Sequence, residues 1–463
     1  MKIVLPEKVT YIIDTLTQHG FEAYAVGGCV RDTMLGRIPM DWDITTSAKP
    51  EQVKALFRHT IDTGIQHGTV TVMLEHEGFE VTTYRIDGEY EDARHPKEVQ
   101  FTSNLLEDLK RRDFTINALA ISLNQENYGV LIDPFGGLQH LEERLIKTPL
   151  DPGLTFSDDP LRMMRAIRFA SQLNFQIEEN TFQAIAEYRH RLPIVSMERI
   201  MDEFNKIMLS PEPSRGIRLL DEAGLLEIFF PELTALKGVD RVQGVKHKDN
   251  FYHTLTVLDT LSLYSQDLWL RWAALLHDIG KPATKKYIQG QGWTFYGHNH
   301  VGERLVGKIF NRLKLPQNEK MKYVQKLVNL HMRPIVLSEE TVTDSAVRRL
   351  LFDAGDDIDD LMTLAEADIT SKNEEKVKRF LENFKTVRRK LKEVEEKDSI
   401  RNFQPPISGE EIIATFHLPP CKTIGDIKNA IKEAILDGII GNNYEEAREY
   451  MFKVAKELGI DSQ

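Results

Sequence analysis

The sequence predicts an α+β domain at the N-terminus, followed by an all-helical remainder. Up to about residue 145, alternating apolar and polar residues predict strands, as in residues 67–86, while residues 50–59 and 104–120 predict helices. This mixture indicates a small mixed sheet backed by helices. After residue 145, nearly every segment has the apolar spacing of an amphipathic helix.

The first predicted strand ends in a glycine turn. The apolar residues 24–26 precede Gly27 and Gly28, which predicts a strand, a turn and the start of a short helix. Backbone N–H groups at the start of a helix suit a phosphate.

Two aspartates follow in the next predicted strand. Side chains at positions i and i+2 of a strand project from the same face, so Asp41 and Asp43 are expected to converge. Converging anions repel each other unless a cation lies between them, and carboxylate oxygens suit Mg²⁺. A lone Asp-x-Asp is more often a solvated loop, but the glycine turn before it makes this pattern more specific.

The helical remainder begins with the segment SDDPLRMMRAIRFASQLNF. Asp159 followed by Pro160 predicts an N-cap and a first turn. Arg162 and Arg165 share one side of this helix, and apolar residues form the other side, namely Leu161, Met164, Phe169 and Leu173. A histidine-rich helical region follows, and residues 403–409 predict a linker to a small helical tail.

Composition limits the function classes. At 463 residues the chain is too long for one core, and 41% hydrophobic with 28% charged residues is ordinary for a soluble protein. The sequence has neither a long apolar span nor a signal peptide, so we expect a cytoplasmic protein without a membrane partner. Its two cysteines, Cys29 and Cys421, predict no disulfide framework. The net charge of −12 argues against wholesale coating by nucleic acid but allows local basic grooves.

Four motifs together resemble the second structural class of the tRNA nucleotidyltransferase and poly(A) polymerase family, in its bacterial form carrying an HD domain. They are GGCVRDTMLG with DWDITT, RRDFTINALA, SDDPLRMMRAIRFA, and PPISGEEI with IGDIKNAIKEAILDGII. The resemblance implies a head of the polymerase-β nucleotidyltransferase type with a five-stranded sheet, followed by all-α neck, body, HD and tail regions. The corresponding predicted boundaries are 1–145, 146–240, 241–400 and 401–463.

The resemblance also implies a reaction. CTP and ATP would donate C, C and A to the 3′ end of tRNA without a nucleic-acid template, releasing pyrophosphate. Asp41 and Asp43 would hold two Mg²⁺ ions, with Glu80 as the candidate third carboxylate. An outward-facing strand glutamate is the alternative for Glu80.

Further residues would bind the nucleotide. Gly27, Gly28 and Arg31 would cradle the triphosphate, with Asp32 orienting the arginine. The ribose hydroxyls would bond to Arg112 and Asp113, with Asn117 one turn further along the same helix. A structural ion pair beside a buried asparagine is the alternative.

Asp159 and Arg162 would select the base, with Arg165 beside them. C and A share an amine donor next to a ring acceptor, which matches an accepting aspartate and a donating arginine and excludes U and G. The family commonly has Glu where this chain has Asp158, which leaves the role of that position open. The alternative is that Asp159 only caps its helix while Arg162 forms a surface pair.

The charged loop at residues 84–101, between the metal motif and RRDFT, resembles the family's loop that helps the change from CTP to ATP. Relatives that add only CC lack it, and here Arg85, Asp92 and Arg94 are the expected participants. The segment QHGTVTV, at residues 66–72, differs from the Gly-Arg-Arg-Phe type sequence of bacterial poly(A) polymerases and disfavours poly(A) synthesis.

A second site is predicted in the histidine-rich region. His253, the pair His277 and Asp278 in LLHDIGKP, and Asp368 resemble the HD phosphohydrolase pattern. Imidazoles with carboxylates suit Mn²⁺, Ni²⁺, Fe²⁺ or Zn²⁺, and such a site could hydrolyse a phosphoester. His298 and His331 would bind a second metal or a substrate phosphate, and His300 lies nearby in sequence.

Three alternatives stay open. One is an A-adding enzyme that works with a separate CC-adding enzyme, because both share every catalytic motif. Another is an HD phosphohydrolase whose head only binds RNA. The third is an RNA chaperone without nucleotide turnover.

Overall fold

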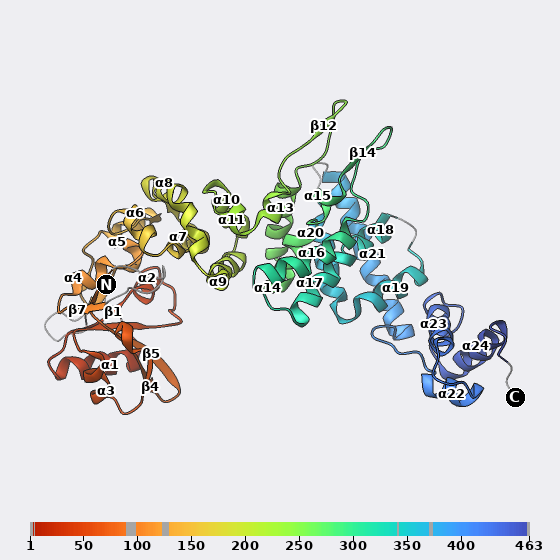
Figure 1. Cartoon of the computed structure of the whole chain (residues 1–463), viewed down its shortest axis with the longest axis horizontal. Coiled ribbons are helices and arrows are strands. Elements are labelled where there is room, and N and C mark those ends of the chain that lie inside the picture. The colour runs from red at the N-terminus through yellow and green to blue at the C-terminus, as the bar shows by residue number, and fades with distance from the viewer. Residues whose placement is uncertain are drawn as a thin grey trace. The chain divides into compact units, whose positions relative to one another are not determined.

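The computed structural model describes residues 3, 5–88, 99–122, 129–339, 342–369 and 374–460. The chain forms two compact units, residues 1–234 and 235–463 (Figure 1). The boundary lies near the predicted border at residue 240, and the finer division inside each unit stays a prediction. As predicted, a mixed sheet with helices comes first and a mostly helical remainder follows.

The sheet of the first unit has the strand order β3-β4-β5-β2-β1-β8-β9. β2 and β5 pair in parallel and the other neighbours pair antiparallel, so the sheet is mixed. The strands are β1 (Ala23–Val26), β2 (Asp43–Thr46), β3 (Thr60–Gly64), β4 (Thr69–Leu74), β5 (Glu77–Thr83), β8 (Ala120–Ser122) and β9 (Leu131–Ile132).

The described sheet therefore has seven strands, and the expected number of five was wrong. The edge strands β3 and β9 are difficult to recognise from the sequence. None of the residues of β3 or β9 is fully buried, so no alternation of core and solvent residues marks these segments.

Helices of the first unit position the pocket residues. Leu109 of α4 packs in one core cluster with Tyr24 and Val26 of β1 and Ala120 of β8. The helices are α1 (Glu7–Gln18), α2 (Gly28–Met34), α3 (Pro50–Leu56), α4 (Leu105–Lys110), α5 (Gly137–Glu143), α6 (Pro152–Asp158), α7 (Leu161–Leu173), α8 (Glu179–Tyr188), α9 (Met197–Met208), α10 (Pro213–Glu222), α11 (Leu226–Phe229) and α12 (Pro231–Thr234).

The prediction that Asn117 follows Arg112 on one helix was wrong. α4 ends at Lys110, and Asn117 belongs to a separate 3₁₀ turn, Thr115–Asn117. Asp113 and Phe114 lie in the turn between them, and the Asp113 carboxylate accepts the N–H of Phe114 at 2.8 Å. This side-chain bond competes with a helical conformation at that point.

The second unit is built mainly of helices. They are α13 (Asn250–Ser262), α14 (Leu268–Leu276), α15 (Lys281–Thr284), α16 (His298–Arg312), α17 (Glu319–Leu330), α18 (Arg333–Glu339), α19 (Asp344–Ala354), α20 (Ile358–Asp368), α21 (Glu374–Asp398) and the tail helices α22 (Gly409–Phe416), α23 (Lys422–Leu436) and α24 (Tyr444–Glu457). None of the described helices combines the length and the apolar composition that crossing a membrane requires.

Short strands interrupt the predicted all-helical part. β10 (Leu145–Ile146) pairs with β11 (Gln176–Ile177), and two hairpins lie in the second unit. The hairpins are β12 (Arg241–Val242) with β13 (Val245–Lys246), and β14 (Lys286–Ile288) with β15 (Gly292–Thr294). Both turn at glycines with positive φ, Gly244 in the first and Gly290 with Gly292 in the second.

Candidate active site

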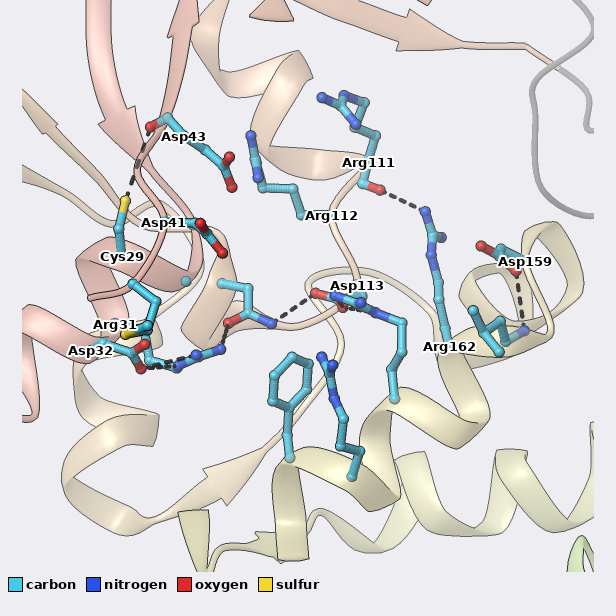
Figure 2. Close-up of a pocket in the computed structure, with 18 of the residues that line it drawn as sticks. Cys29, Arg31, Asp32, Asp41, Asp43, Arg111, Arg112, Asp113, Asp159 and Arg162 are labelled. Atoms are coloured by element: carbon cyan, nitrogen blue, oxygen red, sulfur yellow. Dashed lines mark hydrogen bonds and ion pairs between the residues drawn. The ribbon is translucent and has the colours of Figure 1, made fainter. Parts of the chain in front are cut away.

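Asp41 and Asp43 line one pocket of 610 Å³ in the first unit. Asp43 begins β2 and Asp41 lies just before that strand, and Figure 2 shows both carboxylates on the side that faces Arg112. Loss of hydration raises the pKa of Asp43, the charge of Arg112 lowers it, and the charge of Asp41 raises it again. The two aspartates therefore create a negative potential that a bound divalent cation would relieve.

Glu80 lies opposite Asp43 in the β2–β5 register, and its residue is exposed. Loss of hydration and the charges of Asp43 and Asp41 raise its pKa. Even so, the carboxylate oxygens of Asp41, Asp43 and Glu80 do not all lie within 4.8 Å of one another, unlike the two groups of metal-ligand atoms found among the described residues. The structure thus places Glu80 beside the pair without joining it to the pair.

The glycine turn brings the backbone close to the guanidinium group of Arg112 in the pocket. Gly27 has φ +83°, and a Cβ atom there would lie 3.2 Å from Nη1 of Arg112. On α2, Arg31 donates from Nε to Asp32 at 2.9 Å and from Nη1 to Oδ1 of Asn117 at 2.7 Å. Asp32 therefore orients Arg31, as expected from the sequence.

Asp113 is the centre of a polar network. Its Oδ1 accepts the Phe114 N–H and Nδ2 of Asn117 at 3.0 Å, and its Oδ2 accepts Nε and Nη2 of Arg165 at 2.8 and 2.7 Å. Burial raises the pKa of Asp113, but the charge of Arg165 and these hydrogen bonds lower it to about 2.

A carboxylate has about four lone-pair sites, and the protein occupies four on Asp113. The geometry therefore favours the alternative of an ion pair beside a buried asparagine over a direct ribose contact for Asp113. Through Asn117, the network joins Arg31 of α2 to Arg165 of α7.

Asp159 and Arg162 line the same pocket, one at the end of α6 and the other in the first turn of α7 (Figure 2). The prediction of Asp159 as the N-cap was wrong by one residue, because α7 begins at Leu161 and Pro160 is its N-cap. Asp159 Oδ1 nevertheless accepts the N–H of Leu161 at 3.1 Å. Its Oδ2 lies 3.4 Å from Nη2 of Arg199, and Arg162 donates to the carbonyl of Arg111 at 2.9 Å.

Sequence reasoning missed several residues of this pocket. The ring of Phe169 lies 4.2, 4.9 and 5.3 Å from the guanidinium carbons of Arg168, Arg31 and Arg165. Arg168 continues the spacing of three from Arg162 and Arg165 along α7, so helical periodicity could have found it. Arg199 lies on α9, and no motif pointed to it; Arg111 and Leu161 also line the pocket.

The expected loop residues are only partly placed. Arg85 lies in β6 (Arg85–Asp87), which pairs with β7 (Val99–Phe101), and its Nε lies 2.8 Å from Asp87. It also donates to the carbonyl of His67. Asp92 and Arg94 lie outside the described residues.

In the second unit, the structure brings together the four residues of the predicted HD site. His253 Nε2 lies 2.7 Å from Asp368 Oδ1, and His277 Nε2 lies 3.2 Å from Asp278 Oδ2 and 3.3 Å from Asp368 Oδ1. These side chains come from α13, the end of α14 and the end of α20. Their ligand atoms all lie within 4.8 Å of one another.

Asp278 also belongs to a second group with His298 and His331. Its Oδ1 lies 3.3 Å from His298 Nε2 and 3.7 Å from His331 Nε2. The two oxygens of one carboxylate thus face two sets of imidazoles. His300 is exposed and lines a different pocket, with Asn299 and Glu303.

Backbone carbonyls orient three of these imidazoles. Nδ1 of His277, His298 and His331 lies 2.6, 2.9 and 2.6 Å from the carbonyls of Ala274, Phe295 and Val328. Each Nδ1 is placed to donate to its carbonyl, which directs each Nε2 at the carboxylates, where a deprotonated Nε2 can ligate a metal.

Imidazole nitrogens and carboxylate oxygens that converge in this way fit a divalent cation, which would displace the imidazole protons. Burial lowers the pKa of His277, but the charges of Asp278 and Asp368 raise it to about 10, which shows the excess of negative charge at this point. Close packing positions the cluster, because a Cβ atom on Gly280 would lie 2.2 Å from the carbonyl oxygen of His298.

Three family matches follow the order of these elements. Residues 23–147 match the Poly A polymerase head domain, residues 174–237 a probable RNA and SrmB- binding site of polymerase A, and residues 250–373 the HD domain. A CCA-adding enzyme of Bacillus licheniformis is 33% identical over 445 residues, which cover 96% of this chain and 97% of that protein. The chain belongs to the family of CCA-adding enzymes.

Two further similarities support the assignment. A CCA-adding enzyme of Anoxybacillus flavithermus is 45% identical over 269 residues, and the chain spans only 63% of its length. The crystal structure of the Bacillus stearothermophilus CCA-adding enzyme in complex with CTP aligns with a TM-score of 0.70 and 29% identity, covering 99% of both chains.

Proposed function

We propose that this chain adds C, C and A from CTP and ATP to the 3′ end of tRNA. The observation that supports this most directly is one pocket that holds Asp41 and Asp43 beside a set of arginines. In the reaction, the tRNA 3′-hydroxyl oxygen bonds to the α-phosphorus of the nucleotide, and the bond to the β-phosphate oxygen breaks to release pyrophosphate. We therefore also propose a cytoplasmic location, where tRNA and nucleotides are present.

Asp41 and Asp43 would hold Mg²⁺, because paired carboxylates with substrate phosphates are the usual ligands of that ion. When bound, Mg²⁺ supplies acidification of the attacking hydroxyl and charge neutralisation at the leaving group. Arg31, held by Asp32 and Asn117, would bind the triphosphate. Arg112, which lies close to Gly27, would bind the ribose or the phosphates.

The test uses one tRNA that lacks CCA and another that ends in CC, each incubated with Mg²⁺ and CTP, ATP or both. We expect three additions to the first tRNA, resolved one nucleotide at a time. Extension of the CC-ending tRNA alone would identify an A-adding enzyme with a separate CC-adding partner. Binding of both tRNAs without extension would identify an RNA-binding protein without turnover.

We further propose that Asp159 and Arg162 select the base. Both line the pocket, and a fixed acceptor beside a fixed donor matches C and A but leaves unpaired groups against U and G. Arg199 lies against Asp159 and would hold its carboxylate in place.

Replacing Arg162 with alanine is expected to lower the preference for CTP over UTP about 10- to 100-fold, because a hydrogen bond from a charged donor contributes about 1.5–3 kcal/mol. Single-turnover incorporation of CMP and UMP measures the change. Arg58→Ala, at an exposed position of the same unit, is the control. An unchanged preference in Arg162→Ala would exclude the base-selecting role.

For the second unit we propose a phosphohydrolase site. His253, His277, Asp278 and Asp368 would hold a divalent transition metal, and His298 with His331 would hold a second one or a substrate phosphate. The metal, when bound, supplies an activated water and polarises the phosphoester. The chain's own contribution is the set of Nε2 atoms of His277, His298 and His331, which contacts from Nδ1 to backbone carbonyls orient.

A further inference from the structure

Two hairpins rise from the HD region, and both connect directly to residues of the HD cluster (Figure 1). β13 is followed by His247, Lys248 and then α13, which carries His253. β14 follows α15, which begins three residues after Asp278, and β15 leads into His298 at the start of α16. The bases of both hairpins therefore lie at the cluster, where Lys248 contacts His253 and Lys281 contacts Asp278.

The hairpins are joined to each other. Trp293 Nε1 donates to the carbonyl of Val245 at 3.1 Å, and Lys285 pairs with Asp240. The His247 ring packs edge-on against Trp293 and Phe295, with ring centroids 5.1 and 5.8 Å apart. The two hairpins thus form one continuous surface, which we call the hairpin platform and define as residues 237–249 and 281–296.

The charge of the hairpin platform differs from that of the whole chain. The platform contains seven lysines and arginines and two aspartates, whereas the chain has a net charge of −12. Six of the seven cations are exposed, namely Lys237, Arg241, Lys246, Lys248, Lys285 and Lys286. Such a local excess attracts a polyanion.

Aromatic rings lie among these cations. Tyr296 is 68% exposed, and Tyr287 packs against Trp293 with ring centroids 5.5 Å apart. Lys285 lies over the Trp293 ring at 5.7 Å, and Lys281 lies over the Phe295 ring at 5.4 Å. Cations that follow a phosphate backbone, together with rings on which bases stack, are the means by which proteins bind single-stranded nucleic acid.

Two lysines connect the platform to the metal ligands. Lys281 Nζ lies 2.8 Å from Asp278 Oδ2, and Lys248 Nζ lies 2.8 Å from His253 Nδ1. They would receive a phosphate that approaches the cluster from the platform. A free mononucleotide is too small to contact the cations on the strands, Arg241, Lys246 and Lys286, at the same time as the cluster. An RNA strand with several phosphates can contact both.

We propose that the hairpin platform binds the single-stranded 3′ end of an RNA and presents its terminal phosphoester to the HD cluster. This inference rests on the proposed phosphohydrolase function. It adds the substrate class, an RNA end in preference to a free nucleotide, and it assigns the surface that distinguishes the two.

The test compares two substrates of the full-length protein loaded with Mn²⁺ or Ni²⁺. One is an RNA of about ten nucleotides, within the range of single-strand binding sites, that ends in a 2′,3′-cyclic phosphate. The other is bis(p-nitrophenyl) phosphate, which needs no platform. In the variant Lys246→Glu/Lys286→Glu, we expect KM for the RNA to rise about tenfold and its salt dependence to weaken, because each lost phosphate contact removes ~0.7 from the logarithmic slope.

Hydrolysis of the small ester, CCA addition and the thermal midpoint are expected to stay unchanged in this variant. The control Lys314→Glu/Lys320→Glu makes the same charge change at exposed positions outside the platform and is expected to leave RNA hydrolysis unchanged. An equal loss with both substrates, or an unchanged KM for the RNA, would overturn the proposal.

Photo-cross-linking separates this proposal from the phosphohydrolase function on which it rests. An RNA with 4-thiouridine near its 3′ end is irradiated with the protein in EDTA, where no metal-dependent hydrolysis occurs. We expect cross-linked peptides from the hairpin platform, and cross-links confined to other parts of the chain would overturn it. If the metal-loaded protein hydrolyses neither ester, the phosphohydrolase function fails while the cross-links still decide the binding surface.

Discussion

Replacing Asp43 with alanine is expected to slow CMP and AMP addition to tRNA by at least about 1,000-fold. The change removes one of the two carboxylates that line the pocket with Arg112, and with it a ligand for the cations that stabilise the transition state by several kcal/mol. Single-turnover extension of a tRNA lacking CCA measures the rate. Filter binding of the same tRNA is expected to remain within about twofold, because surface substitutions of this kind leave the fold intact.

Asp62→Ala is the matched control for this prediction. Asp62 is an exposed aspartate in β3 of the same sheet, where it pairs with Lys54 at 2.9 Å. We expect this variant to extend tRNA at the normal rate. Normal extension by Asp43→Ala would instead show that the reaction takes place elsewhere, and the head would then serve only to bind RNA.

Replacing Asp278 with alanine is expected to lower phosphoester hydrolysis by at least about 1,000-fold while CCA addition stays normal. The effect is large because Asp278 faces His277 through one oxygen and His298 with His331 through the other. Its loss removes a ligand from both groups at once. Metal content after dialysis, measured by mass spectrometry, is expected to fall in parallel with activity.

Asp353→Ala is the control here, since Asp353 is an exposed aspartate of the same unit that pairs with Arg333. EDTA treatment of the unaltered protein should reproduce the hydrolytic defect of Asp278→Ala, and added Mn²⁺ or Ni²⁺ should reverse it. Retention of both metal and hydrolysis in Asp278→Ala would exclude the HD cluster as a hydrolytic site. Loss of CCA addition would show that the two activities share a site.

The sequence predicted the parts of the fold in which local patterns and motifs agree. The glycine turn, the paired aspartates after it and the start of a helix just after Asp159 depend on neighbouring residues, so a single sequence contains them. The four residues of the HD cluster were also proposed from sequence, because an adjacent His-Asp after an apolar helix is a specific pattern.

Other features depend on contacts between distant segments. Arg199 reaches Asp159 from α9, and nothing in its own neighbourhood indicates this. The prediction extended one helix as far as Asn117, but α4 ends at Lys110. The N–H of Phe114 then donates to the Asp113 carboxylate, a hydrogen bond that the apolar pattern does not reveal. The hairpins of the second unit were missed because each strand is only two or three residues long, too short for an alternating pattern to be recognised.

One chain of hydrogen bonds crosses the pocket. It runs from Asp32 through Arg31, Asn117 and Asp113 to Arg165. Every link is 3.0 Å or shorter, and the middle of the chain is buried, so Arg31, which we propose binds the triphosphate, is held at a fixed separation from Arg165 on the helix of the proposed base-selecting Arg162. A purine is larger than a pyrimidine, and a buried chain of short hydrogen bonds does not lengthen to accommodate the larger base. If the pocket takes CTP and then ATP, as we propose, the change between them would come from parts outside this chain of bonds, such as the growing RNA end. The product of each step would then select the nucleotide for the next.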